Sequence, residues 1–308
     1  MSTEGSTRAI LAALLANAGI AIAKFIGFVI TGSSSMLAEA VHSVADTSNQ
    51  GLLLLGQRQA RKEADQVHQF GYGRSRYFYS FVVALVLFTL GSVFALYEGY
   101  HKISHPEGLT SPSVAIAILV VAIGLESYSF RTAVVESRPL KGSGGWWRFI
   151  RTSRNPELPV VLLEDAGALI GLIFALVGVG LTVLTGDAIW DGIGTVGIGV
   201  LLGVIAIILM VEMHSLLIGE GATKQEDAAI RAALEQTEHV DRLIHIRTQY
   251  LGPDELLVGA KIALAPQTDL ATVAATIDAA EAAVRAAVPA ARVIYLEPDL
   301  DRALTGRA

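Results

Sequence analysis

The sequence predicts an α-helical membrane protein: six transmembrane helices followed by a small α+β ferredoxin-like domain in the cytoplasm. Hydrophobic residues make up 52% of the chain and charged residues only 17%, whereas soluble domains carry roughly 25% charged residues. The mean hydropathy is +0.52. Apolar segments fill residues 8 to about 217, and a more charged segment follows. We therefore expect a membrane domain over 8–219 and a second domain over 222–303.

Six apolar segments are long enough to cross a bilayer, because about 30 Å of hydrocarbon requires roughly 20 helical residues. They lie at about 9–31, 33–57, 77–101, 112–136, 157–184 and 188–217. The first segment is too long for the apolar region of a secretory signal peptide. We therefore expect it to remain as the first span.

The basic residues between these segments predict the orientation. Arginine and lysine gather in 58–76 and 138–154, whereas 31–35, 101–111 and 185–187 contain a single lysine. Cytoplasmic loops carry the excess of basic residues, so both termini are expected in the cytoplasm. The chain shows no targeting segment, and we expect a multi-pass protein of a prokaryotic inner membrane.

The C-terminal segment predicts the element order α-β-β-α-β. Its expected helices and strands lie at 224–236, 240–250, 254–263, 268–287 and 291–296. The two neighbouring strands alternate in polarity, and Gly252-Pro253 between them is typical of a turn. About 85 residues make a small domain with limited stability of its own, so we expect this domain to form a homodimer.

The second predicted span carries His42 and Asp46, which indicate a metal site. Four residues make about one helical turn, so both side chains leave the same face. Ionisable groups at bilayer depth are costly and mark a function by default. Imidazole and carboxylate are ligands of divalent metals, and the chain contains no cysteine. A divalent cation is the expected partner.

The fifth span supplies further acids, Glu164 and Asp165. With a rise of 1.5 Å per residue, His42 lies about 14 Å from the outer end of its span and Glu164 about 12 Å from the inner end of its own. Both positions are near the middle of the bilayer, where they can meet. Neighbouring helical residues point about 100° apart, so only one of the two acids is expected to face the histidine.

Other polar residues of the spans allow more than one interpretation. Glu39 lies one turn before His42. It could serve as an entry acid for the ion or as a proton-handling neighbour of the histidine, or it could simply be an acid in contact with water. Asn49 fits a hydrogen bond between helices better than metal ligation. Lys24, Glu98 and Asp191 occupy the outer halves of their spans, and we expect an ion pair among them.

The segment Gly192–Gly197 fits the dinucleotide-binding pattern G-x-G-x-x-G. That pattern signifies a nucleotide site only after a strand and at the start of a helix, whereas this one lies within a long apolar helix. We expect its small residues to allow close helix packing.

Three segments make the family of the chain apparent: Thr31–Ala38, His42–Asp46 and Ala64–Arg74. With the six spans and the α-β-β-α-β domain, they resemble the cation diffusion facilitator family over about residues 8–300. The resemblance implies a homodimer that exports Zn²⁺ or a similar ion, usually in exchange for protons. It also implies a four-ligand site between the second and fifth spans.

The fifth span departs from the family. Most members repeat His-x-x-x-Asp there, and alignment on Asp191 places Glu164 and Ala168 at those positions. The run Leu162–Asp165 resembles a divergent subgroup that includes the mitochondrial zinc transporter of animals. The resemblance then implies the ligands His42, Asp46 and Glu164, with Asp165, Asn49 or water as the fourth.

Two further metal sites of the family are altered in this chain. The cytoplasmic loop keeps Asp65 and His68 as possible accessory ligands, but Tyr72 replaces a histidine. The positions of the dinuclear site in the C-terminal domain correspond to Ile244, Ala260, Tyr295 and Glu297. We expect no dinuclear site there.

The sequence thus predicts a secondary transporter that exports divalent cations, Zn²⁺ first, with Mn²⁺, Co²⁺ or Fe²⁺ as further candidates. Metal binding requires neutral imidazole and ionised carboxylates, so protons compete for the site and can serve as counter-ions. One alternative is a transport-inactive scaffold or metal sensor. An intramembrane metalloenzyme is disfavoured because no HExxH-type motif is present. We expect no cofactor beyond the transported ion, membrane lipid as a partner, and no nucleic acid.

Overall fold

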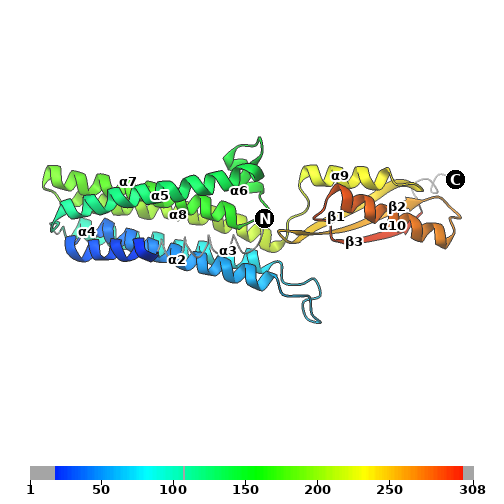
Figure 1. Cartoon of the computed structure of the whole chain (residues 1–308), viewed down its shortest axis with the longest axis horizontal. Helices are drawn as coiled ribbons and strands as arrows, with labels where there is room; N and C mark the ends of the chain where they lie inside the picture. The colour runs from blue at the N-terminus through cyan, green and yellow to red at the C-terminus, as the bar shows by residue number, and fades with distance from the viewer. Residues whose placement is uncertain (1–17, 107, 301–308) are drawn as a thin grey trace. The chain divides into compact units, whose positions relative to one another are not determined.

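The computed structural model describes residues 18–106 and 108–300, which form two compact units (Figure 1). The first unit contains the described residues up to Arg58 and the segment Tyr77–His214. The second contains the loop Gln59–Arg76 and the chain from Ser215 onward. The loop therefore belongs to the same compact unit as the C-terminal segment. The domain limits 8–219 and 222–303 stay a prediction.

The first unit is a bundle of long helices. Its elements are the helix Ala18–Thr31, α2 (Ser34–Ala60), α3 (Ser75–Val86), the π-helical segment η1 (Leu87–Val93), α4 (Phe94–Ser104), α5 (Pro112–Lys141), the short α6 (Trp146–Thr152), α7 (Glu157–Thr185) and α8 (Ile189–Ile218). The segments α3, η1 and α4 form one continuous helix. α5 lies along α7 (Figure 1).

Four helices in the described part of the chain are long and apolar enough to span a membrane: Ser75–Ser104, α5, α7 and α8. The predicted first span begins at residue 9, and its first half lies outside the described residues. Helix α2 has 27 residues but carries many polar side chains, and these lower its hydropathy. These four helices are therefore candidate spans by length and composition, and the count of six stays a prediction.

The glycines of α8 pack closely against two neighbouring helices. A Cβ on Gly194 would lie 2.9 Å from the carbonyl oxygen of Phe174 in α7, and one on Gly199 would lie 2.8 Å from the backbone nitrogen of Leu96 in α4. Only a residue without a side chain allows such approaches. The prediction that the segment Gly192–Gly197 serves helix packing is confirmed.

The second unit has the predicted order α-β-β-α-β. Its elements are α9 (Lys224–Glu235), β1 (Val240–Gly252), β2 (Glu255–Leu264), α10 (Leu270–Ala287) and β3 (Val293–Asp299). β2 pairs with β1 in antiparallel and with β3 in parallel orientation, giving the sheet order β1-β2-β3. A complete ferredoxin-like unit has four strands, so the ferredoxin-like description stays a prediction for this three-stranded sheet.

The core of the second unit is apolar. Ile230 and Leu234 of α9 and Val284 of α10 pack against one set of alternating strand residues, including Leu256 and Val258 of β2. Alternate residues of a strand face opposite sides of a sheet. Both helices therefore cover the same face.

The loop Gln59–Arg76 contacts the turn between β1 and β2. A Cβ on Gly73 would lie 2.8 Å from the carbonyl oxygen of Leu251, so the two backbones touch. Arg76 Nη1 lies 2.9 Å from Asp254 Oδ2. These contacts explain why the loop belongs to the C-terminal unit.

Candidate metal-binding site

The start of α2 is fixed by a buried acid of α8. Asp191 accepts hydrogen bonds from the backbone N–H of Ser34 (2.9 Å) and from the hydroxyls of Ser33 (2.9 Å) and Ser34 (3.1 Å). A carboxylate at a helix N-terminus satisfies unpaired N–H groups and interacts favourably with the helix dipole. Asp191 thus holds one end of the helix that carries the candidate ligands.

The predicted ion pair among Lys24, Glu98 and Asp191 is wrong for the lysine. Lys24 Nζ instead lies 3.0 Å from Glu39 Oε2 and 4.0 Å from Glu126 Oε1. Glu126 was not among the polar residues predicted to interact here. Its signal was an acid within the apolar segment 112–136, where an unpaired carboxylate is costly.

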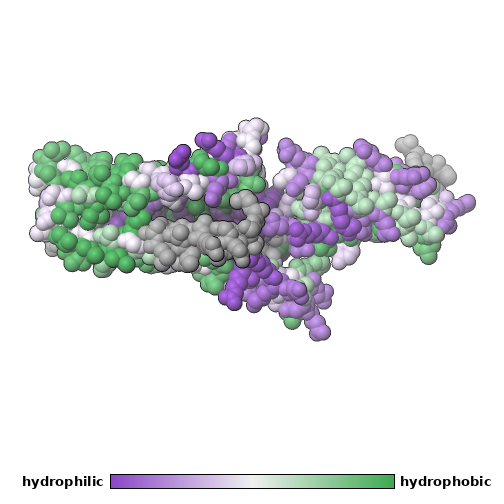
Figure 2. Space-filling model, viewed as in Figure 1, coloured by the Kyte–Doolittle hydropathy of each residue, from purple (hydrophilic) through white to green (hydrophobic). Residues whose placement is uncertain are grey.

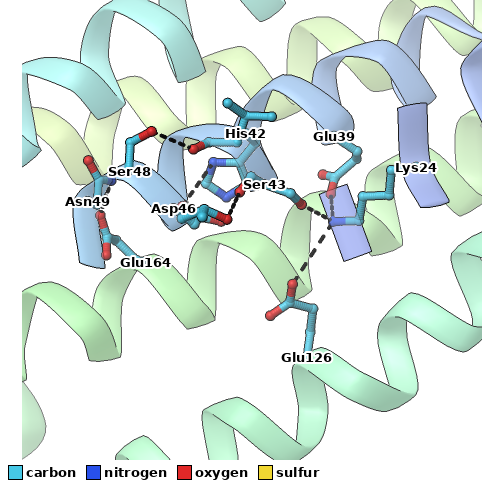
Figure 3. A network of polar contacts seen from close by, with 11 residues as sticks. Lys24, Glu39, His42, Ser43, Asp46, Ser48, Asn49, Glu126 and Glu164 are labelled. Carbon is cyan, nitrogen blue, oxygen red and sulfur yellow. Dashed lines mark hydrogen bonds and ion pairs between the residues drawn. The ribbon is translucent and has the colours of Figure 1, made fainter. Parts of the chain in front are cut away.

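His42 and Asp46 lie together on one face of α2 (Figure 3). His42 Nδ1 is 3.6 Å from Asp46 Oδ1, which is too long for a hydrogen bond. The imidazole is fully buried. Both ring nitrogens and Asp46 Oδ1 are without a hydrogen-bond partner among the described residues.

Glu164 of α7 faces α2 one turn beyond this pair. Asn49 Nδ2 donates a hydrogen bond of 2.6 Å to Glu164 Oε1, and Glu164 is 5% exposed. Asn49 therefore joins the two helices by a hydrogen bond, the interpretation that the sequence favoured over metal ligation. Because the amide is bonded to the carboxylate, it also sets where the carboxylate lies.

Asp165 points to a different helix. The hydroxyl of Ser129 in α5 donates a hydrogen bond of 3.0 Å to Asp165 Oδ2. Neighbouring residues of a helix differ by about 100° in direction, and α7 places its two acids toward α2 and α5 respectively.

Two glycines of α7, one turn apart, face different helices. A Cβ on Gly171 would lie 2.7 Å from Glu39 Oε1 of α2. A Cβ on Gly167 would instead lie 2.8 Å from Ile205 Cδ1 of α8. Four residues advance a helix by slightly more than one turn, and α7 lies where two neighbours meet, so successive glycines serve different contacts.

Unpaired polar atoms gather on α2. Among the described residues, six buried side-chain atoms of this helix have no hydrogen-bond partner: Glu39 Oε1, His42 Nδ1, His42 Nε2, Asp46 Oδ1, Asn49 Oδ1 and Gln50 Oε1. Buried polar atoms are nearly always paired, so each such atom requires an explanation. The four oxygens are acceptors, and so is one of the two nitrogens of a neutral imidazole. Five of the six atoms can therefore bind a cation.

Acidic side chains outnumber basic ones in this region. Five acids accompany one lysine and one histidine. Glu39, Glu126 and Glu164 are buried, and Asp46 and Asp165 are half-buried. Carboxylates are expensive to bury without a partner, and a cation or protons would offset that cost. No three His, Asp or Glu residues within 18–106 and 108–300 lie close enough to hold a metal ion together, so ion binding requires side chains of α2 and α7 to approach.

The accessory loop residues form a local turn. Asp65 accepts hydrogen bonds from the Tyr72 hydroxyl (2.6 Å) and from the backbone N–H of His68 (2.6 Å). The bond from Tyr72 and then that from the His68 backbone lower the pKa of Asp65 to about 2. The tyrosine that replaces the family's histidine therefore occupies one oxygen of the acid.

In the C-terminal domain, the residues at the positions of the family's dinuclear site have different surroundings. Ala260 is buried in the core, and Tyr295 is 62% exposed. Glu297 is paired with Lys261, with 2.7 Å between Oε1 and Nζ. Glu297, the only one of these four residues with a carboxylate, thus already has a cationic partner.

Comparison with known proteins decides the family. A family model described as the cation efflux transmembrane domain matches residues 10–218. The chain belongs to the cation efflux family. This membership confirms the resemblance to cation diffusion facilitators and establishes a multi-pass membrane domain.

Relatives within the cation efflux family share most of this chain. It is 30% identical over 261 residues to the mitochondrial proton-coupled zinc antiporter SLC30A9 of Homo sapiens, covering 84% of this chain and 46% of that protein. It is 29% identical over 268 residues to metal tolerance protein C4 of Arabidopsis thaliana, covering 85% and 58%. The chain thus spans about half the length of these relatives.

The C-terminal domain of MamM is a solved structure with some likeness to the chain. It covers 24% of this chain and 94% of that domain, with 20% identity and a TM-score of 0.23.

Proposed function

We propose that this protein exports divalent metal cations, Zn²⁺ first, in exchange for protons, through a site formed by His42, Asp46 and Glu164. The observation that carries the proposal is the unpaired polar face of α2, with Glu164 of α7 directed at it. Imidazole nitrogen and carboxylate oxygens are the ligands that Zn²⁺ takes in proteins without cysteine. A relative named as a proton-coupled zinc antiporter supports the same substrate and counter-ion.

The binding step follows from the contacts. Asn49 holds Glu164 by a hydrogen bond. An ion that arrives beside Asp46 gives the carboxylate of Glu164 a stronger partner than the amide of Asn49. Asn49 acts as a positioning residue that keeps the carboxylate near the site. Asp165 is the alternative fifth-helix ligand, and its bond to Ser129 must break before it can bind an ion.

Exchange follows from competition for the same atoms. A bound metal requires an unprotonated imidazole nitrogen and ionised carboxylates, and protons reverse both conditions. A site near the middle of the bilayer must open to one side at a time, because simultaneous access would short-circuit the gradient. Protons entering from the outer side therefore release the metal there.

A transport-inactive scaffold or sensor is the second candidate. It is favoured by Ala168, which provides no ligand where most of the family has an aspartate. Such a protein binds metal without moving it. We propose transport rather than this role or an enzymatic one because the unpaired atoms lie on a helix between other long helices.

Proteoliposome flux tests the proposal. Purified protein is reconstituted, and uptake of Zn²⁺, Mn²⁺, Co²⁺ and Fe²⁺ is measured with and without a pH gradient. We expect metal flux that rises with the gradient and is accompanied by proton movement in the opposite direction. Binding without flux for all four ions contradicts transport and favours the scaffold.

We further propose six spans with both termini in the cytoplasm, a prokaryotic inner membrane and a homodimer formed through the C-terminal unit. The chain contains no cysteine, so single cysteines report accessibility without background. We expect Glu63→Cys to react with an impermeant reagent from the cytoplasmic side only and Gly108→Cys from the opposite side only. The reverse pattern overturns the orientation.

A further inference from the structure

One feature of the polar network is not used by the proposed transport site: a lysine buried among oxygen ligands (Figure 3). Lys24 is fully buried. Its Nζ lies 2.8 Å from Ser43 Oγ, 3.0 Å from Glu39 Oε2 and 4.0 Å from Glu126 Oε1. Side chains of α2 and α5 therefore converge on an ammonium group supplied by the first described helix.

We propose that Glu39, Ser43 and Glu126 form a second cation subsite, which the ammonium group of Lys24 fills in place of a divalent ion. Two carboxylates and a hydroxyl are oxygen ligands, the set that hard cations such as Mn²⁺ prefer. The role assigned to the subsite rests on the proposed transport function, because Glu39 lies about one turn from His42 on the same helix.

An unpaired atom at this position supports a cation subsite independently of the acids themselves. Glu39 Oε1 is fully buried and has no hydrogen-bond partner among the described residues. A Cβ on Gly171 would lie 2.7 Å from it, so the atom faces the bare backbone of α7. Lys24 therefore satisfies one oxygen of this carboxylate, and its removal would leave both oxygens of Glu39 for a cation.

The polar partners that the described residues give Lys24 are Glu39, Ser43 and Glu126. Lys24 also helps to line a partly open hollow of about 250 Å³ whose other lining residues are apolar, Ile20, Ala117, Val121 and Leu125 among them. An ammonium group is strongly hydrated in water and is costly to place against apolar atoms. Lys24 therefore stays with the carboxylates.

The ammonium group of Lys24 affects how a transported ion can leave its site. An ion leaving Asp46 toward Ser34 passes Glu39, and empty carboxylates there would bind it and delay release. Lys24 occupies these oxygens with a charge that cannot leave. The lysine thus limits the protein to ion binding at the transport site.

Metal stoichiometry tests this assignment. Purified full-length protein in detergent is dialysed against Mn²⁺ or Zn²⁺, and the bound metal is measured for Lys24→Met and Lys24→Arg. We expect Lys24→Met to bind one additional Mn²⁺ per protomer and to show a weaker gain with Zn²⁺. Lys24→Arg keeps the positive charge and should bind as the wild type does.

A second substitution locates the additional ion. Adding Glu126→Gln to Lys24→Met removes one carboxylate of the subsite and should abolish the extra Mn²⁺. Wild-type stoichiometry in Lys24→Met overturns the proposal, as does an extra ion that persists in Lys24→Met/Glu126→Gln.

Stability provides a second measurement, because removing the lysine leaves buried acids uncompensated and weakens the fold. We expect Mn²⁺ to raise the melting temperature of Lys24→Met by several degrees more than that of the wild type. A Lys24→Met protein that neither binds the additional ion nor is stabilised by Mn²⁺ contradicts the subsite.

The result is separable from the transport proposal. The extra Mn²⁺ of Lys24→Met should persist when Asp46→Ala is added, because Asp46 is not a ligand of the second subsite. If Asp46→Ala retains wild-type flux, the transport proposal fails, whereas the extra ion still reports on Lys24. Loss of the extra ion in Lys24→Met/Asp46→Ala places that ion at the transport site and overturns the second subsite.

Discussion

The two units of the molecule distribute polar and apolar residues in opposite ways. In the first unit, Glu39, His42 and Glu164 are buried, whereas Val29 and Leu184 are largely exposed. In the second unit, the buried residues are apolar apart from Thr276, and ion pairs such as Arg231–Asp227 and Arg285–Glu281 lie at the surface. Figure 2 shows broad hydrophobic surface on the helical unit and mixed polar surface on the C-terminal unit.

This difference indicates which interactions stabilise each unit. Lipid is as apolar as a leucine side chain, so helices in a membrane gain little from hiding apolar surface. The first unit instead uses close glycine contacts and buried hydrogen bonds, such as those of Gly194 and Asp191. The second unit is stabilised by removing apolar side chains from water. Replacing buried polar residues should therefore damage function in the first unit, and replacing buried apolar residues should damage stability in the second.

The largest expected effect concerns the pair on α2. His42→Ala or Asp46→Ala should abolish metal flux while the protein stays folded, because each removes a proposed ligand. Flux into proteoliposomes measures the loss, and size-exclusion chromatography checks the fold. Ser48→Ala is the matched control, since Ser48 is exposed and, within the described part of the chain, its hydroxyl bonds to the carbonyl of Val44 in its own helix. Wild-type flux in Asp46→Ala removes the central proposal.

The next prediction separates the two acids of α7. Glu164→Gln should weaken metal affinity on the order of 100-fold, because even outer partners of metal ligands cost 10–100-fold when lost. Asp165→Asn should cost less than about tenfold, because Asp165 is directed at Ser129 in α5. Titration calorimetry of both variants measures the ratio. If the ratio is reversed, Asp165 replaces Glu164 in the ligand set.

The third prediction concerns the core of the second unit. Leu256→Ala removes a fully buried side chain and should destabilise this unit by about 2–5 kcal/mol, with metal affinity at the transport site unchanged. Hydrogen exchange of the β2 amides in the full chain measures the loss. Leu257→Ala is the control, because Leu257 points to the opposite, less buried face. Equal effects of the two substitutions contradict the one-sided core.

The smallest expected effect concerns the loop Gln59–Arg76. Hydrogen bonds favour the ionised form of Asp65, so its pKa of about 2 lies below the ordinary value of about 3.9. The resulting contribution to loop stability is fully present above the ordinary pKa and is lost as the pH falls through about 2. Tyr72→Phe should raise the pKa of Asp65, as measured by NMR titration of its carboxyl carbon. An unchanged pKa shows that the tyrosine bond is not the cause.

Local sequence patterns predict most helices and strands and the residue types of the candidate site. Apolar length predicted α5, α7 and α8 to within a few residues, except that α5 continues to Lys141. Alternation and turn residues predicted the order of the second unit. The spacing of His42 and Asp46 placed them on one face. These properties depend on local periodicity, which the chain carries within each segment.

Which helices face one another depends on tertiary packing. It directed Glu164 to Asn49, paired Lys24 with Glu39 and Glu126, and turned Gly167 toward α8 instead of α2. Each outcome depends on how one helix is rotated against its neighbours. Rotation is set by the sum of contacts along both helices, and no single segment contains that sum.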